Sequence, residues 1–159
     1  MELGVISDTH IPERADYIPG TLVEFLKSVD LIIHAGDITS EKFYNQLQEL
    51  NEIKAVAGNM DSRALKNSLP KKEVIDCNGY LIGITHGDQY MGDLKQKLNY
   101  EFSECDLIIF GHIHQPVNKK ENNKYFFNPG SVTNPRSYPY PTYGRIIVGD
   151  KIEREIINI

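Results

Sequence analysis

The sequence has few cysteines, no long hydrophobic run and no block of basic residues, and each absence narrows the class of protein. Its two cysteines, Cys77 and Cys105, lack the spacing of a metal site, which favours a reduced, cytoplasmic compartment. The longest apolar runs, such as residues 31–33 and 107–110, are too short to span a bilayer. The first residues lack the basic stretch of a signal peptide, so we expect none.

Acidic residues outnumber basic ones, and the formal net charge is −5. The basic pairs Lys71-Lys72 and Lys119-Lys120 are isolated. Because proteins that bind nucleic acid tightly carry clustered positive charge, we expect no tight non-specific binding to nucleic acid and no membrane partner. A small phosphodiester or a nucleotide-sized substrate stays compatible with this charge. By analogy at the level of the fold alone, we also expect a homodimer.

The chain of 159 residues is most simply a single domain, residues 1–159, long enough to bury a core. In its first half, apolar runs typical of buried strands (residues 3–7, 31–35 and 53–57) alternate with segments of helical spacing (21–28 and 40–50). This alternation predicts βαβ units, a parallel sheet and right-handed crossovers.

The second half changes rhythm. Asn78-Gly79 is a strong hairpin signal, and Asp93 is a helix cap. The expected elements are strands at 73–75, 80–85 and 106–110, a helix at 93–102, a polar hairpin at 117–127 and paired strands at 143–148 and 151–157. We therefore predict a parallel core joined to antiparallel strands, arranged as two packed sheets with helices outside.

Polar groups follow most of these apolar runs directly. The blocks are Ser7-Asp8-Thr9-His10, Gly36-Asp37, Gly58-Asn59-Met60-Asp61, Thr85-His86-Gly87-Asp88 and Gly111-His112-Ile113-His114. Strand-end loops of an open α/β sheet converge in space, and ligands bind there. Seven imidazole, carboxylate and amide groups at one edge are enough for two transition-metal ions.

The spacing within the blocks suggests how they hold metal. Asp8 and His10 lie two residues apart, so in an extended loop both side chains project the same way. His112 and His114 repeat this spacing, and Gly111 allows a sharp turn before them.

A second set of expectations concerns the ions themselves. A carboxylate at Asp37 can bridge two ions with its two oxygens. Nitrogen and oxygen ligands without thiolate suit Mn²⁺, Fe²⁺, Zn²⁺, Co²⁺ or Ni²⁺.

These five ordered blocks resemble the signature of the calcineurin-like metallophosphoesterases. Chain size and Asn128-Pro129-Gly130-Ser131 make the sequence most similar to the small YfcE-type phosphodiesterases of bacteria and archaea. The resemblance implies an α/β fold, a four-layer α/β/β/α sandwich of two mixed sheets flanked by helices. It also implies two divalent ions, with Mn²⁺ as the first expectation and Ni²⁺, Fe²⁺, Zn²⁺ or Co²⁺ as alternatives. The implied ligands are Asp8, His10, Asp37 and His114 for one ion, and Asp37, Asn59, His86 and His112 for the other.

The activity implied is that of a phosphodiesterase. A water shared by two ions roughly 3.5–4 Å apart loses a proton and attacks phosphorus, with Asn59 near the phosphoryl group. Many relatives have a histidine that protonates the leaving group where this chain has Met60. We therefore expect phosphodiesters to be favoured over alkyl monoesters.

Other interpretations stay open. The protein could be a non-catalytic metal-binding scaffold that resembles the retromer subunit of this fold, whereas its small size and acidic charge weaken a DNA-repair type of nuclease. Asp61 and Asp88 are as typical of a turn or a supporting position as of a chemical role. We expect His34 to be a core histidine that supports Asp37, and the 128–131 segment to be a tight turn.

Overall fold

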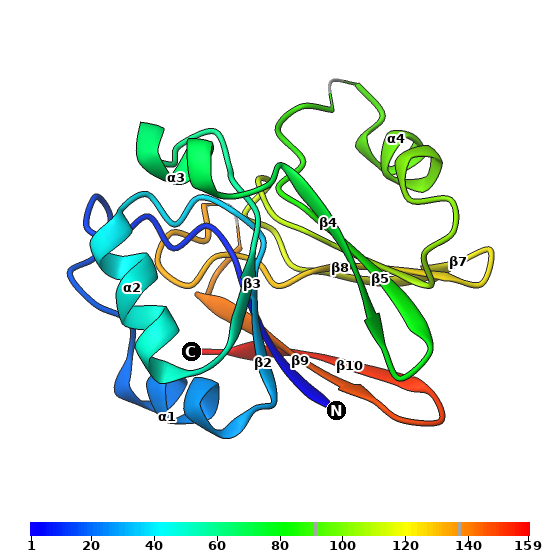
Figure 1. The fold of residues 1–159 in the computed structure, drawn as a ribbon, viewed down its shortest axis with the longest axis horizontal. Coiled ribbons are helices and arrows are strands. Elements are labelled where there is room, and N and C mark those ends of the chain that lie inside the picture. Colours follow the sequence, from blue (N-terminus) through cyan, green and yellow to red (C-terminus); the bar gives the residue numbers. More distant parts are fainter. Residues whose placement is uncertain (91, 137) are drawn as a thin grey trace.

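The computed structural model describes residues 1–90, 92–136 and 138–159 and contains two sheets of five strands each (Figure 1). The first sheet has the strand order β10-β9-β1-β2-β3. Its strands are β1 (Glu2–Ile6), β2 (Leu31–His34), β3 (Ile53–Ala55), β9 (Thr142–Val148) and β10 (Ile152–Asn158). β1, β2 and β3 are parallel, as the βαβ pattern predicts, and β9 joins β1 in antiparallel register.

The second sheet has the order β4-β5-β6-β8-β7. Its strands are β4 (Lys72–Cys77), β5 (Tyr80–Thr85), β6 (Leu107–Phe110), β7 (Val117–Glu121) and β8 (Lys124–Asn128). β5, β6 and β8 are parallel, and β4 and β7 are antiparallel edge strands. Asn78 and Gly79 have φ angles of 53° and 84°. These left-handed residues form the tight turn that the hairpin prediction required.

The helices are α1 (Gly20–Ser28), α2 (Glu41–Leu50), α3 (Arg63–Ser68) and α4 (Leu94–Glu101). Ser40 caps α2 by accepting from the Phe43 N–H, and Asp93 caps α4 in the same way, so both predicted caps are confirmed. We did not predict α3, which has six residues and one buried side chain, Leu65. A helix this short carries too little periodic pattern to be recognised from sequence.

Four layers result from this arrangement. A cluster of buried side chains lies between the two sheets, and among its members are Leu3, Ile33, Ile84, Ile109 and Phe127. A second apolar cluster joins α1, α2 and α3 to the outer face of the first sheet, and a third joins α4 to the outer face of the second. Figure 1 shows α1 and α2 on one side of the sheets and α4 on the other. The predicted α/β/β/α sandwich is confirmed.

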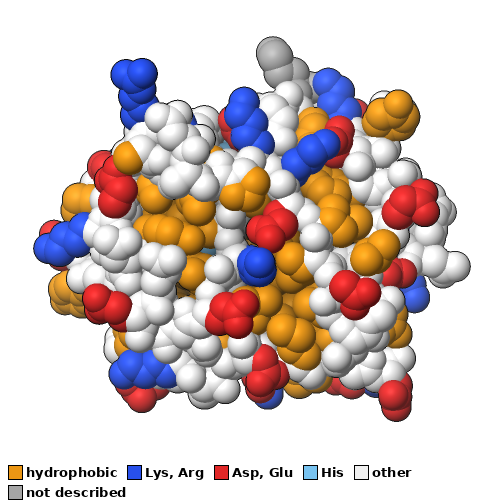
Figure 2. Space-filling model, in the orientation of Figure 1, with side chains coloured by type: hydrophobic (Ala, Val, Ile, Leu, Met, Phe, Trp, Pro, Cys, Tyr) orange, Lys and Arg blue, Asp and Glu red, His pale blue; other side chains and the backbone are white. Residues whose placement is uncertain are grey.

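One broad face of the molecule is shown in Figure 2, in the orientation of Figure 1. Acidic and basic side chains are scattered over this face singly, with apolar side chains exposed between them. One exposed apolar residue is Val74, on the edge strand β4. Among the described residues, no helix combines the length and the apolar character that crossing a bilayer requires.

Candidate metal centre

The loops that follow β1, β2, β3, β5 and β6 meet at one edge of the sandwich. His86, after β5, lies with its Nδ1 2.8 Å from the carbonyl oxygen of Ala35, after β2. The backbone N–H of His112, after β6, donates to Oδ2 of Asp8, after β1, at 3.1 Å. The carboxyl ends of the parallel strands of both sheets therefore converge, as we predicted from the position of the polar blocks.

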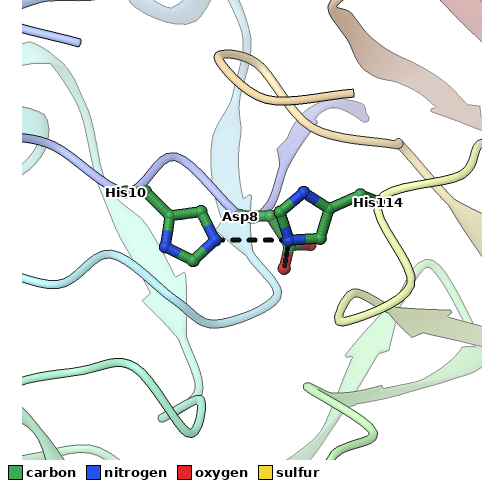
Figure 3. A group of neighbouring side chains, drawn as sticks. All are labelled: Asp8, His10 and His114. Carbon is green, nitrogen blue, oxygen red and sulfur yellow. Dashed lines mark hydrogen bonds and ion pairs between the residues drawn. The ribbon is translucent and has the colours of Figure 1, made fainter. Parts of the chain in front are cut away.

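Asp8, His10 and His114 form one compact group (Figure 3). The two imidazole Nε2 atoms are 3.3 Å apart, and Oδ1 of Asp8 is 3.2 Å from Nε2 of His114. All three residues are buried, and their ligand-type atoms lie within 4.8 Å of one another. The buried Oδ1 of Asp8 accepts no hydrogen bond from the described residues. An orphaned carboxylate oxygen beside two imidazoles fits a bound cation.

Asp37 and His86 form a second group with Asp8. Oδ2 of Asp37 is 3.3 Å from Nε2 of His86 and 3.6 Å from Nε2 of His10, so it lies between the two groups. Oδ1 of Asn59 is 3.2 Å from Nε2 of His86. The ring of His112 packs against that of His86, with centroids 5.2 Å apart.

Asp37 lies near both groups. Its Oδ2 is within 3.6 Å of the Nε2 atoms of His10 and His86, and its bridging of two ions stays a prediction. The other oxygen, Oδ1, accepts the backbone N–H of Met60 at 2.7 Å. A carboxylate held at one oxygen offers the second oxygen in a fixed direction.

The backbone at the site is left-handed. The φ angles are 51° at Asp8, 46° at His10, 58° at Asp37, 68° at His112 and 58° at His114. The expectation of an extended loop was therefore wrong both for Asp8 with His10 and for His112 with His114. Non-glycine residues in this region cost of order 1–3 kcal/mol each and persist where the surrounding structure holds them. Hydrogen bonds between loops do so here, since Asp8 N donates to Gly36 O at 3.0 Å.

At Gly111 and Gly58 the absence of a side chain provides space for the site. A Cβ on Gly111 would lie 2.6 Å from the Ala35 carbonyl oxygen and 2.9 Å from Oδ2 of Asp8. The chain turns sharply here, as we expected, because the Ile113 N–H donates to the Gly111 carbonyl oxygen at 2.8 Å. The φ of Gly111 itself is not positive, so the close contacts are what exclude a side chain at this position. A Cβ on Gly58 would meet the carboxylate of Asp37 and lie 2.5 Å from its backbone nitrogen.

Burial and charge set the protonation of the histidines. Burial lowers the pKa of His10 and of His112, which favours the neutral imidazole that binds metal. Burial also opposes a charged His86, but the hydrogen bond that His86 donates to Asp37 and the charges of Asp8 and Asp37 outweigh it and raise the pKa of His86 to about 9. The two carboxylates therefore stabilise positive charge at this point of the site.

A turn after β8 supports two loops of the site, the loop after β1 and the loop after β6. Ser131 Oγ donates to the Asp8 carbonyl oxygen at 2.7 Å, and Asn128 Nδ2 donates to the Gly111 carbonyl oxygen at 2.8 Å. His114 donates from Nδ1 to the Asn134 carbonyl oxygen at 2.5 Å, which leaves its Nε2 free to coordinate. The 128–131 segment forms the turn we expected, and its contacts with the loops after β1 and β6 are an additional finding. The contact of Ser131 with Asp8 joins residues 123 positions apart, for which the sequence holds no local signal.

The structure also locates four further residues that the sequence analysis singled out: His34, Asp61, Asp88 and Met60. His34 is buried, and its Nε2 lies 3.0 Å from Thr9 Oγ1, so it touches Asp37 only through Thr9 and does not support it directly. Asp61 is buried within the site, whereas Asp88 is exposed. Met60 is 55% exposed beside Asn59.

Comparison with known proteins places this geometry in a family. Residues 1–151 match the family model of the calcineurin-like phosphoesterase superfamily domain, so the chain belongs to this superfamily. A "Probable metallophosphoesterase" from Methanothermobacter thermautotrophicus is 38% identical over 160 residues, which cover 99% of this chain and 92% of the relative. The resemblance that we inferred from the five blocks is confirmed.

Solved structures show the same fold. Vps29 from Chaetomium thermophilum superposes with a TM-score of 0.86 at 23% identity and covers 99% of this chain and 97% of its own. Vps29 from Entamoeba histolytica, solved in complex with Zn²⁺, has a TM-score of 0.80 at 25% identity and covers 99% of both chains.

Proposed function

We propose that this protein is a dinuclear metal-dependent phosphodiesterase acting on small phosphodiesters or nucleotide-type substrates. The observation that carries the proposal is the pair of buried ligand groups that share Asp8, with Oδ2 of Asp37 between them. The assigned ligands are Asp8, His10, Asp37 and His114 for one ion, and Asp37, Asn59, His86 and His112 for the other. This set of nitrogen and oxygen atoms suits Mn²⁺ first, and Ni²⁺, Fe²⁺, Zn²⁺ or Co²⁺ as alternatives.

The chain supplies orientation and a partly closed site. When bound, two such ions activate a water at neutral pH and draw charge from the phosphoryl oxygens. Asp8 and His114 are almost fully buried, so they keep solvent from the inner side of the site. Asn59 lies at the outer side, next to the exposed Met60, and we assign its amide to the neighbourhood of the phosphoryl group.

The substrate preference follows from Met60. Its thioether is exposed beside Asn59, where it can touch the ester group that leaves, but it has no proton to donate. A leaving group that is stable as an anion needs no acid, so aryl and nucleotide diesters should react better than alkyl monoesters. The net charge of −5 favours a small diester over long nucleic acid.

The test is hydrolysis of bis(4-nitrophenyl) phosphate by metal-stripped protein titrated with Mn²⁺. We expect turnover that depends on Mn²⁺ and falls at least about a hundredfold in Asp37→Ala and in His112→Ala. Asp76→Asn is the matched control, because Asp76 is an exposed carboxylate that accepts one backbone N–H in the β4–β5 turn. Equal turnover in all four proteins would refute the proposal.

A second candidate function is a non-catalytic scaffold that binds ions for structure. Met60 favours it, because a site without an acid at this position is less equipped for ester cleavage. Binding of Mn²⁺ without turnover on diesters, monoesters or nucleotides would select this alternative.

A further inference from the structure

The buried carboxylate of Asp61 joins two loops of the site. It accepts three backbone N–H groups: that of Thr39 at 2.7 Å on Oδ1, and those of Gly58 at 2.6 Å and Asp37 at 3.3 Å on Oδ2. Asp37 and Thr39 belong to the loop after β2, and Gly58 belongs to the loop after β3. Asp61 is only 4% exposed, so water does not compete for these donors.

The contact between the two loops runs in both directions. Asp61 accepts the N–H of Asp37, and the neighbouring Met60 N–H donates back to Oδ1 of Asp37. The Ser62 N–H also donates to the carbonyl oxygen of Thr39 at 3.2 Å. Movement of either loop would break bonds on both carboxylates at once.

The bonds on Asp61 hold a backbone that is otherwise unfavourable. Asp37 and the β-branched Thr39 have φ angles of 58° and 79°. Successive N–H groups in such a turn point to one side and form a concave site for an anion. Here the Asp61 carboxylate is that anion, and it holds the turn that carries Asp37.

We propose that Asp61 is a positioning residue that fixes Asp37 relative to Asn59 and so sets the affinity for the ion these two share with His86 and His112. This role rests on the ligand assignment of the proposed function. The other ion also takes Asp37 but depends less on Asp61, because its ligands Asp8 and His114 are held by the separate turn at 128–134.

The decisive variant is Asp61→Asn, which keeps the size of the side chain but has one acceptor oxygen. Whichever way its amide points, its NH₂ group faces at least one of the N–H donors, and that donor loses its partner. Asp76→Asn is again the control, because it makes the same chemical change at a turn distant from the site.

The experiment is calorimetric titration of each metal-free protein with Mn²⁺. We expect two binding steps in the wild type, of which one is weakened about 10–100-fold in Asp61→Asn and the other changes by less than about threefold. Activity of Asp61→Asn should recover as Mn²⁺ is raised to saturation, a rescue that general loss of structure would not produce. Asp76→Asn should match the wild type in both steps.

Two unchanged steps, an equal weakening of both steps, or a wild type that binds one ion overturns the proposal. If Asp61→Asn does not fold, amide hydrogen exchange in the metal-free wild type decides: protected amides at Thr39 and Gly58 support the role, and freely exchanging amides refute it. If the wild type binds two ions but cleaves no phosphodiester, the proposed function fails while the titration still decides the role of Asp61.

Discussion

Acid should destabilise the metal-free protein through His34, a residue outside the set of ligands. His34 is fully buried in β2, and its Nδ1 has no hydrogen-bond partner among the described residues. Burial lowers the pKa of His34 to about 3, against about 6.5 in the unfolded chain. Between pH 6.5 and pH 3, His34 is therefore protonated in the unfolded state and neutral in the folded state.

The size of the effect follows from this difference in pKa. Because the folded pKa is the lower one, the stabilisation is present above pH 6.5 and is lost as pH falls from 6.5 toward 3. At pH 4.5, about two pKa units have been crossed, and each is worth about 1.4 kcal/mol. We therefore expect His34 to remove about 2–3 kcal/mol of unfolding free energy between pH 7 and pH 4.5.

Urea unfolding of the wild type and of His34→Gln, both in EDTA, measures this contribution at the two pH values. Glutamine does not titrate, and the other acid-sensitive groups, such as His10 and His112, occur in both proteins and cancel in the comparison. The wild type should lose about 2–3 kcal/mol more than the variant on acidification. The same loss in both proteins would show that His34 is not held neutral in the folded state.

Three further perturbations follow from the site. Mn²⁺ at a hundred times its dissociation constant should add about 2.7 kcal/mol per ion to the unfolding free energy, and a thermal shift that Asp37→Ala does not diminish would contradict the ligand assignment. Gly58→Ala should lower the unfolding free energy in urea by about 1–3 kcal/mol and weaken Mn²⁺ binding, because the added Cβ meets Asp37. Wild-type values for both quantities would show that the two loops can shift apart without cost. Ser131→Ala should cost about 1–3 kcal/mol, since its hydroxyl donates to Asp8 O and accepts from Asn134 N–H, and unchanged stability would show that the turn does not brace the site.

Local patterns in the sequence were sufficient for most of the secondary structure. The parallel strands β1, β2 and β3 follow from apolar runs separated by helical segments, and the hairpin at Asn78-Gly79 follows from residues that tolerate positive φ. The caps at Ser40 and Asp93 could be predicted equally well, because a cap depends on side chains within one turn. The six-residue α3 could not be predicted, since one buried leucine makes no periodic pattern.

The sequence by itself also determined which residues lie at the site, because polar groups at the ends of parallel strands must meet at one edge. Only the tertiary structure decided how they lie. The left-handed backbone at Asp8 and His114, the position of Asp37 Oδ2 near both histidines and the bonds that Asp61 accepts all depend on contacts between loops of different strands. Such contacts exist only after the two sheets have packed, and no spacing along the chain records them.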